Sequence, residues 1–319
     1  MSDAMKIKAI APWFGGKRTL APRIVAELGP HTQYFEPFCG SMAVLLAKQP
    51  AQKETANDMH GDLMNLARVI ADPHLAPVLY ERLAVAPMCE ALLEDARQVI
   101  ESSSDDAEPR DVDRAFWYFL ASWQGRNGTA GTARMDYQIA VRWTKNGGSP
   151  TVRFRNAVQS IPVWHARLLN VVMLCCDAFK FIDRFEDCPG TAIYVDSPYT
   201  AETRNNLGGK NGGGGRYKHE FTNRGVNMPQ RGGMFEGDAE DRDDHERLAA
   251  ALRGYSKARI VVSYYDCPKV RDLYPGWTVV DCATNKQLHQ QNGRGRRSAI
   301  APEILLINGP SLTAGGPAA

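Results

Sequence analysis

The stretch "FEPFCGSMAVLL" (35–46) joins a β-rich segment to a helical one through a glycine turn. Aromatic residues before Gly40 are typical of a strand, and the apolar run after Ser41 is typical of a helix. In an α/β sheet, a strand–turn–helix connection is where a nucleotide-like ligand approaches the backbone. A lone glycine turn is more often a plain connection between a strand and a helix. Evidence for a ligand site therefore has to come from the rest of the chain.

Four more β-rich runs follow along the chain: "TAIYVD" (191–196), "RIVVSYYD" (259–266), "WTVVDC" (277–282) and "EILLIN" (303–308). Helical patterns lie between several of them, including "SMAVLLAKQ" (41–49) and "DDHERLAAALR" (243–253). Asp243 or Asp244 is a suitable N-cap for the second of these helices. Strands that alternate with helices predict an α/β fold with a mostly parallel sheet.

The middle of the chain has a different pattern. Apolar residues near helical spacing predict helices over 62–123. Glycine turns then separate short runs rich in arginine and aromatic residues over 124–156, which predicts a basic β-hairpin or ribbon. Residues 110–170 carry nine arginines and lysines against three aspartates, so this part is locally basic. The glycine-rich stretch 202–242 is predicted to be mobile, and 311–319 to be a disordered tail.

Composition excludes several classes of protein. The formal net charge of +2 does not by itself indicate a nucleic-acid binder. The seven cysteines form no C-x-x-C pair, and the chain shows neither a signal-peptide pattern nor an apolar run of about 20 residues. We therefore expect a cytoplasmic protein without a metal site. "GGK" (15–17) is not a phosphate-binding loop, because Ala11 and Arg18 occupy positions where that motif needs glycine and serine or threonine.

Two carboxylates are predicted at the same edge of the sheet as the glycine turn. Asp58 in "ETANDMHGDL" (54–63) follows a short segment, where a carboxylate can bind both hydroxyls of a ribose. Alone it could equally be a helix cap. Asp177 follows the strand-like "LNVVMLCC" (169–176). Together with the turn at Gly40, Asp58 outlines an adenosine site.

Taken in order, these features resemble the D12 class of DNA adenine N6-methyltransferases, which includes the Dam methylases. The resemblance covers most of the chain and rests on an ordered set of motifs. They are the start at Trp13–Lys17, "EPFCGS" (36–41), "ND" (57–58), "DSPY" (196–199), "DDHERL" (243–248), "SYYD" (263–266) and "EILLIN" (303–308).

The resemblance implies a Rossmann-like, largely parallel sheet with an antiparallel strand near its end. It implies a discontinuous catalytic domain (1–62 and 157–310) that binds S-adenosylmethionine, and an inserted helical target-recognition domain with a basic β-hairpin (63–156). It also implies an adenine-specific methyltransferase that acts on a particular sequence in double-stranded DNA. We expect the chain to be a monomer.

Residues that match the family pattern take on roles by resemblance. The cofactor set is Trp13, Lys17, Glu36, Phe38, Gly40, Asp58, Asp177 and Asp196, with Asp58 on the ribose. The catalytic set is Asp196, Ser197, Pro198 and Tyr199. We predict DNA contacts from two basic segments, through Arg126, Asn127, Arg134, Arg142, Lys145, Arg153, Arg155, Arg294, Arg296 and Arg297.

The chemistry of "DSPY" follows from the target amine. The lone pair of the adenine N6 amine is delocalised into the ring, so two acceptors facing its hydrogens would draw it out of conjugation. The Asp196 carboxylate and the carbonyl of residue 197 can serve, and Pro198 keeps residue 197 extended. Tyr199 would stack on the base, which has to leave the duplex to be reached. The amine then attacks the methyl group in line.

Two positions depart from the family pattern: Ser197 stands where proline is usual, and Met42 where a second glycine is usual. Serine supplies the same backbone carbonyl, so we expect Ser197→Pro to keep or raise activity. Met42 could crowd the cofactor, or the turn could be complete at Gly40 and Ser41. The alternatives are methylation of cytosine N4, RNA or a glutamine amide, or a DNA-binding protein that has lost catalysis.

Overall fold

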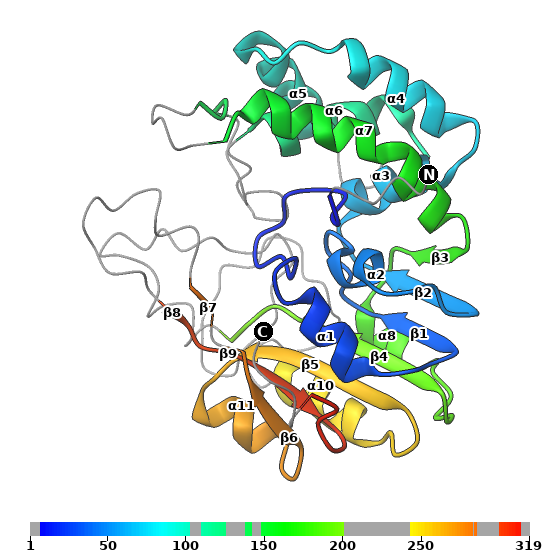
Figure 1. Ribbon diagram of the computed structural model, residues 1–319, viewed down its shortest axis with the longest axis vertical. Coiled ribbons are helices and arrows are strands. Elements are labelled where there is room, and N and C mark those ends of the chain that lie inside the picture. Colours follow the sequence, from blue (N-terminus) through cyan, green and yellow to red (C-terminus); the bar gives the residue numbers. More distant parts are fainter. Residues whose placement is uncertain are drawn as a thin grey trace. The chain divides into compact units, whose positions relative to one another are not determined.

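The computed structural model describes residues 7–102, 110–125, 138–141, 148–200, 243–282, 284–285 and 300–313. Seven strands form a mixed sheet in the order β3-β2-β1-β4-β5-β9-β6 (Figure 1). They are β1 (Gln33–Glu36), β2 (Lys53–Asn57), β3 (Val171–Leu174), β4 (Thr191–Val195), β5 (Arg259–Tyr265), β6 (Thr278–Asp281) and β9 (Glu303–Ile307). A separate short pair consists of β7 (Thr284–Asn285) and β8 (Ile300–Ala301).

The pairing of the strands confirms a mostly parallel sheet with an antiparallel strand near the end of the chain. Pairs β2–β3, β1–β4 and β4–β5 are parallel, whereas β9 is antiparallel to both β5 and β6. In β4–β5 the register sets Val195 opposite Val262. The residues that follow β4 therefore run alongside the end of β5.

The helices of the described residues lie before β1 and between the strands. They are α1 (Ala21–Leu28), α2 (Ala43–Ala47), α3 (Gly61–Ala71), α4 (Leu75–Val85), α5 (Glu90–Ser102), α6 (Val112–Gln124), α7 (Pro150–Leu168), α8 (Ala178–Ile182), α10 (Asp244–Arg253) and α11 (Pro268–Leu273). The helices predicted over 62–123 are thus confirmed as α3 to α6. Asp243 is the N-cap of α10, because its carboxylate accepts hydrogen bonds from the N–H groups of His245 and Glu246.

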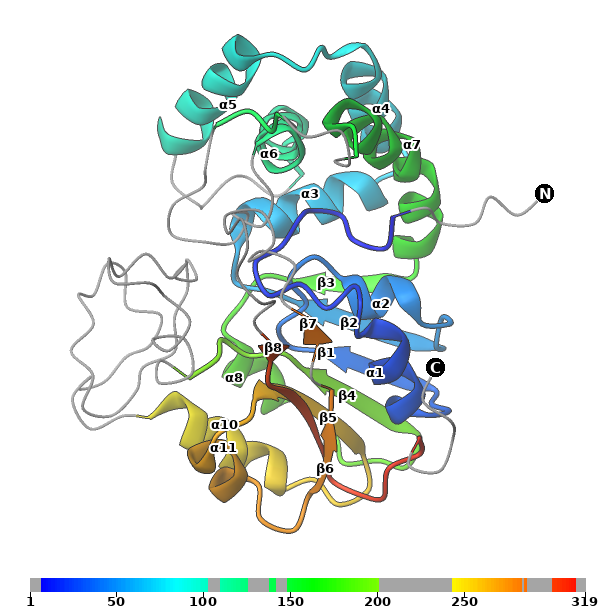
Figure 2. The same cartoon turned by 60° about the vertical axis from the view of Figure 1, so that its left-hand side comes forward.

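One compact unit contains the described residues of 7–21 and 36–178. Its helices α4, α5, α6 and α7 pack together (Figure 2). The indole N–H of Trp123 donates to the carbonyl of Ile10 at 3.1 Å, and that of Trp164 donates to Ile7 at 2.7 Å. Both indoles are buried, so their bonds tie the start of the described chain to the helices. The domain boundary predicted between residues 62 and 63 lies inside this unit, which contains the residues on both sides of it.

The predicted hairpin over 124–156 is wrong for residues 150–156, which form the start of α7. Ser149 is the N-cap and accepts from Val152, and Pro150 occupies the first turn, where its missing N–H costs no hydrogen bond. "S-P-T" is therefore a helix start rather than a turn between strands. Residues 126–137 and 142–147 of the predicted ribbon lie outside the described part of the chain, as does the stretch 202–242.

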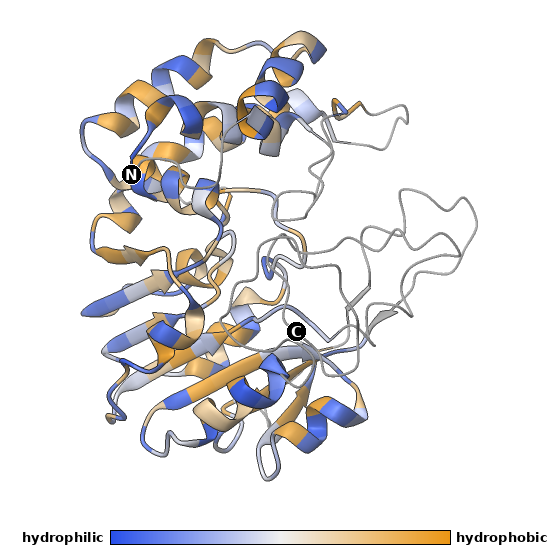
Figure 3. Ribbon diagram, turned by 180° about the vertical axis from the view of Figure 1, so that it is seen from behind, coloured by the Kyte–Doolittle hydropathy of each residue, from blue (hydrophilic) through white to orange (hydrophobic). Residues whose placement is uncertain are grey.

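The second compact unit contains the described residues of 22–35, 179–200 and 243–313. Its strands β4 and β9 are buried along their whole length, as β5 is except at its two end residues, and hydropathy colouring shows the three as largely hydrophobic (Figure 3). Continuous apolar strands of this kind are typical of a sheet covered on both faces.

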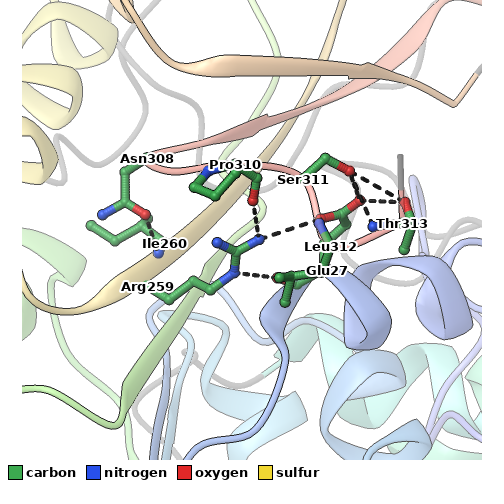
Figure 4. Close-up of polar contacts among 8 residues, drawn as sticks. All are labelled: Glu27, Arg259, Ile260, Asn308, Pro310, Ser311, Leu312 and Thr313. Carbon is green, nitrogen blue, oxygen red and sulfur yellow. Dashed lines mark hydrogen bonds and ion pairs between the residues drawn. The ribbon is translucent and has the colours of Figure 1, made fainter. Parts of the chain in front are cut away.

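A buried carboxylate anchors the last described residues in this unit (Figure 4). Glu27 on α1 is fully buried and accepts hydrogen bonds from the Ser311 hydroxyl at 2.6 Å, from the N–H of Leu312 at 2.9 Å and from the Thr313 hydroxyl. Arg259 donates to the carbonyls of Glu27 and Pro310. The predicted disorder is therefore wrong for residues 311–313, because a charged group inside the protein requires these donors.

Candidate functional site

The loop after β1 turns sharply between Cys39 and α2. Gly40 has φ of 44° and Met42 has φ of 60°, both in the left-handed region. The N–H of Met42 bonds the carbonyl of Cys39 at 2.7 Å, and Met42 is the N-cap of α2 with its side chain fully buried. The turn is therefore not complete at Ser41: it extends through the position where a second glycine is usual.

Gly40 is required by a close approach as well as by its backbone angle. A Cβ at this position would lie 2.7 Å from Nε1 of Trp13, which is too short for any real contact. The Trp13 ring also lies edge-on to His60, with ring centroids 5.5 Å apart. The structure thus brings together Trp13 and Gly40, two of the residues predicted to bind the cofactor.

Asp58 holds the same turn through its carboxylate. Oδ2 accepts the N–H of Gly40 at 2.8 Å, and Oδ1 accepts the N–H of His60 at 2.9 Å. The side chain is half-buried. The carboxylate thus joins the glycine turn to the segment that follows β2. Binding of a vicinal diol by Asp58 stays a prediction.

Asn57 is the residue of this region to which the sequence reasoning gave no role. Its amide donates to the carbonyls of Pro37 at 3.0 Å and Cys176 at 2.9 Å, and its oxygen accepts the N–H of Cys176 at 3.0 Å. The side chain is fully buried. Asn57 thus ties the turn after β1 to the end of β3. The sequence feature that could have indicated this role is the position of Asn57 at the end of a short segment, next to Asp58.

The remaining predicted cofactor residues of this unit have definite places. Lys17 is buried, and its ammonium donates to the carbonyl of Gly15 at 2.8 Å. Glu36 is buried at the end of β1, and Phe38 is half-buried in the turn that follows. Asp177 is half-buried directly after Cys176, the residue that Asn57 fixes.

The "DSPY" motif begins where the buried strand β4 ends. Asp196 is half-buried, and its Oδ1 accepts a hydrogen bond from the Ser263 hydroxyl on β5 at 2.8 Å. The Tyr194 hydroxyl lies 3.0 Å from the same Ser263 oxygen. Ser263 has one hydroxyl hydrogen and gives it to Asp196, so Tyr194 is the donor to Ser263. These two consecutive hydrogen bonds fix the rotation of the Asp196 carboxylate.

Ser197 makes a second contact with β5. Its buried hydroxyl donates to the Tyr264 hydroxyl at 2.8 Å, which lies 2.9 Å from Nδ1 of His245 on α10. Burial raises the pKa of Tyr264 well above its usual value. Because the phenol stays protonated at neutral pH, it can accept from Ser197 while donating to His245.

Tyr199 is held at both ends of its ring. Its hydroxyl donates to Oε1 of Glu303 on β9 at 2.6 Å, and its ring lies edge-on to Tyr265 with centroids 4.6 Å apart. The Tyr199 side chain is almost fully buried. The stacking of Tyr199 on a target base stays a prediction, and Glu303 is a partner that the sequence reasoning did not single out.

The N-terminus of α10 supports His245. Asp243 caps the helix and also accepts from the Lys269 ammonium on α11 at 2.5 Å. Burial opposes ionisation of Asp243, but the hydrogen bonds from Lys269 and from the N–H of Glu246 lower its pKa overall. The carboxylate is therefore ionised at neutral pH. His245 and Glu246 lie in the first turn of this helix.

Two of the predicted DNA-binding arginines lie in α7 and contact helices. Arg155 donates to the carbonyls of Leu83, Ala84 and Ala86 at the end of α4, at 2.7 to 3.3 Å. Arg153 donates to the carbonyl of Trp123 at 3.2 Å. A cation at a helix C-terminus is favourable. The other eight predicted DNA-contacting residues lie outside the described residues.

Within the described ranges, no cluster of histidine, cysteine, aspartate or glutamate has a geometry that could hold a metal ion. In the same ranges, no helix is long and apolar enough to cross a membrane.

The fold and the family match are consistent with one class of protein. A mixed α/β sheet of seven strands with helices is compatible with a methyltransferase fold. Residues 13–123 match the family of D12 class N6 adenine-specific DNA methyltransferases, which confirms the resemblance predicted from the motifs. The matched segment contains Trp13, Gly40 and Asp58 and ends before "DSPY". No curated protein matches the chain.

Proposed function

We propose that this protein transfers a methyl group from S-adenosylmethionine to the N6 amine of adenine within a specific sequence of double-stranded DNA. The observation that carries the proposal is the turn at Gly40, which the carboxylate of Asp58 holds inside the segment matched by the methyltransferase family. The protein acts as a monomer in the cytoplasm, as the sequence predicts.

The residues around the turn fit the nucleoside part of this cofactor. Asp58 would bind the ribose hydroxyls, Trp13 and the Gly40 backbone would flank the nucleoside, and Asp177 would lie toward the adenine. Glu36, Phe38 and Lys17 complete the proposed set. When bound, S-adenosylmethionine supplies a methyl group on a positively charged sulfur. At Gly40 the space that a Cβ would fill is taken by Nε1 of Trp13, so the missing Cβ lets Trp13 lie against the main chain of the turn, where it would flank the nucleoside.

Asp196 and Ser197 would act on the target amine. Ser263 donates to Oδ1 of Asp196 and so orients the carboxylate, which would accept one amine hydrogen. The Ser197 carbonyl would accept the other hydrogen, and Tyr199 would contact the flipped base. These acceptors favour the nitrogen geometry needed in the transition state, so their contribution is to rate more than to binding.

The arginines predicted to contact DNA differ in what the structure shows of them: Arg155 is bound to carbonyls of α4, whereas Arg126, Arg134 and Arg142 lie outside the described residues. Arg155 makes three bonds to helix carbonyls, so Arg155→Gln should lower the melting temperature. Arg126, Arg134 and Arg142 are proposed phosphate contacts, and replacing all three by glutamine should reduce the salt slope of DNA binding by about one unit per lost contact. An unchanged slope would remove this segment from the DNA interface.

The direct test is to express the chain in a host that lacks N6-methyladenine and to sequence its DNA for that base. N6-methyladenine at one recurring sequence is expected, and its absence from an Asp196→Ala strain is the control. Methylated cytosine N4, or methyl transfer to RNA or protein with none to DNA adenine, would contradict the proposal. Cofactor binding without methyl transfer would favour a DNA-binding protein that has lost catalysis.

A further inference from the structure

Two consecutive residues of β5 hold two consecutive residues of the "DSPY" motif. The parallel register continues from Val195 opposite Val262, so Asp196 runs beside Ser263 and Ser197 beside Tyr264. Successive side chains of a strand point to opposite faces. Ser263 therefore reaches Asp196 on one face, at 2.8 Å, while Tyr264 reaches Ser197 on the other, also at 2.8 Å.

The contact on the second face is a buried relay of three groups. The relative exposures of Ser197, Tyr264 and His245 are 1%, 0% and 0%. The Ser197 hydroxyl donates to the Tyr264 oxygen, and the Tyr264 hydroxyl is hydrogen-bonded to Nδ1 of His245 at 2.9 Å. A buried hydrogen bond cannot be replaced by water, so removing one member leaves its neighbour unpaired.

His245 is itself held in place. Its N–H bonds the capping carboxylate of Asp243, and its ring lies edge-on to Tyr264 with centroids 5.7 Å apart. Lys269 fixes Asp243 from α11. The relay therefore connects the backbone after β4 to a rigid helix start rather than to a free side chain.

We propose that Tyr264 and His245 are positioning residues that hold residue 197 through its hydroxyl, so that the Ser197 carbonyl faces the amine hydrogen of the target base. The inference rests on the proposed function. Tyr264 touches neither substrate nor cofactor in this account. Its effect passes through Ser197, and it is separate from the contact between Ser263 and Asp196.

Proline at position 197 offers a way to test this assignment. Proline fixes φ covalently and needs no acceptor. If the relay serves to restrain residue 197, proline should make the Tyr264 hydroxyl unnecessary. Ser197→Pro is then expected to rescue Tyr264→Phe. In the wild-type background the same change only removes the hydrogen bond that Ser197 donates to Tyr264.

The experiment compares Ser197→Ala, Tyr264→Phe, the double variant, and Tyr264→Phe combined with Ser197→Pro. Single-turnover methyl transfer to duplex DNA should fall at least about tenfold in each single variant, with unchanged cofactor affinity, because misplacing a reacting group affects the chemical step. The double variant should be no slower than the singles, and Ser197→Pro should restore the rate. Tyr255→Phe, which removes a bond to the Ile182 carbonyl, is the matched control.

A readout that does not depend on activity accompanies the rates. Hydrogen–deuterium exchange of the peptide spanning 194–200 should increase in Tyr264→Phe and stay unchanged in Tyr255→Phe. Multiplying effects of the two single changes, or unchanged exchange in Tyr264→Phe, would overturn the assignment of Tyr264. If exchange increases in Tyr264→Phe as expected but the wild-type protein methylates no adenine, the proposed function is overturned. The contact between Tyr264 and Ser197 would then still be established.

Discussion

The loop after β1 (37–42) and the described part of the loop after β4 (196–200) both follow a strand, but they are held in different ways. In the first, Asn57 and Asp58 bind main-chain groups of residues 37 and 40. In the second, Asp196, Ser197 and Tyr199 each offer a side chain to a partner on β5 or β9. The first loop is fixed by its backbone, the second by its side chains.

This difference predicts how each loop responds to substitution. A backbone-held loop depends on the residues that supply the bonds and on glycine where the chain turns left-handed. A loop held by side chains depends on its own side chains and on their acceptors in neighbouring strands. The first arrangement suits a ligand that lies against the main chain. The second suits precise placement of reacting groups.

The largest effect is expected at Asp196. Asp196→Ala should reduce single-turnover methyl transfer by at least about 100-fold, because the lost acceptor acts in the transition state. The melting temperature should change little, because the side chain of Asp196 is half-buried and belongs to a loop rather than to the packed core. Asp183→Ala, an exposed aspartate of the same unit, is the control. Full activity in Asp196→Ala would refute the catalytic role of the second loop.

Asn57→Ala tests the backbone-held loop. It would remove the donor to the buried carbonyl of Pro37, at about 1–3 kcal/mol, and the bonds to the half-buried Cys176. We expect a lower midpoint of urea unfolding with an unchanged slope, measured against the exposed control Asn170→Ala. Equal midpoints for the two variants would show that Asn57 does not hold the loop.

Asp58→Ala should weaken S-adenosylmethionine binding, by about 1–3 kcal/mol in titration calorimetry, because ribose hydroxyls and the Gly40 N–H would both lose an acceptor. Asp95→Ala, on the exposed side of α5, is the matched control. Affinity that is the same in both variants would remove Asp58 from the cofactor site and leave it only a structural role in the turn.

The smallest expected effect is a difference in stability between two substitutions of Met42. Met42→Gly and Met42→Ala both remove a fully buried side chain and should destabilise the protein. The glycine variant should be more stable than the alanine variant by about 1 kcal/mol, because at φ of 60° alanine keeps the left-handed strain and glycine does not. Equal unfolding free energies would mean that the turn relaxes once methionine is gone.

Much of the fold was predictable because it depends on local patterns. Alternating apolar strands and helices identified the sheet, and Asp243 marked the start of α10. The partners of the second loop were not predictable, because Ser263, Tyr264 and Glu303 lie 67 to 104 residues along the chain from the groups they bind. Pairing at that distance is set by strand order, which the sequence does not state.

Two sequence-based expectations change for a related reason. The sequence shows Arg155 only as a positive charge, whereas the structure engages it with carbonyls of α4. The sequence likewise presents Ser197 as a carbonyl that proline could supply equally well. Since its hydroxyl donates to Tyr264, Ser197→Pro in the wild-type background loses a buried bond, and unchanged activity is no longer the expected result.

The hydrogen bonds from residues 311–313 to the Glu27 carboxylate make stability at acid pH depend on the last described residues. Burial alone would raise the pKa of Glu27, but bonds from Ser311, Thr313 and Leu312 lower it overall. A lowered pKa adds stability that is present above the unfolded value, about 4.3, and disappears as the pH falls through the folded value. A chain shortened at Pro310 would enclose a carboxylate without these donors. Ser311 to Thr313 therefore belong to the minimal folding unit, and affinity tags should be attached beyond them.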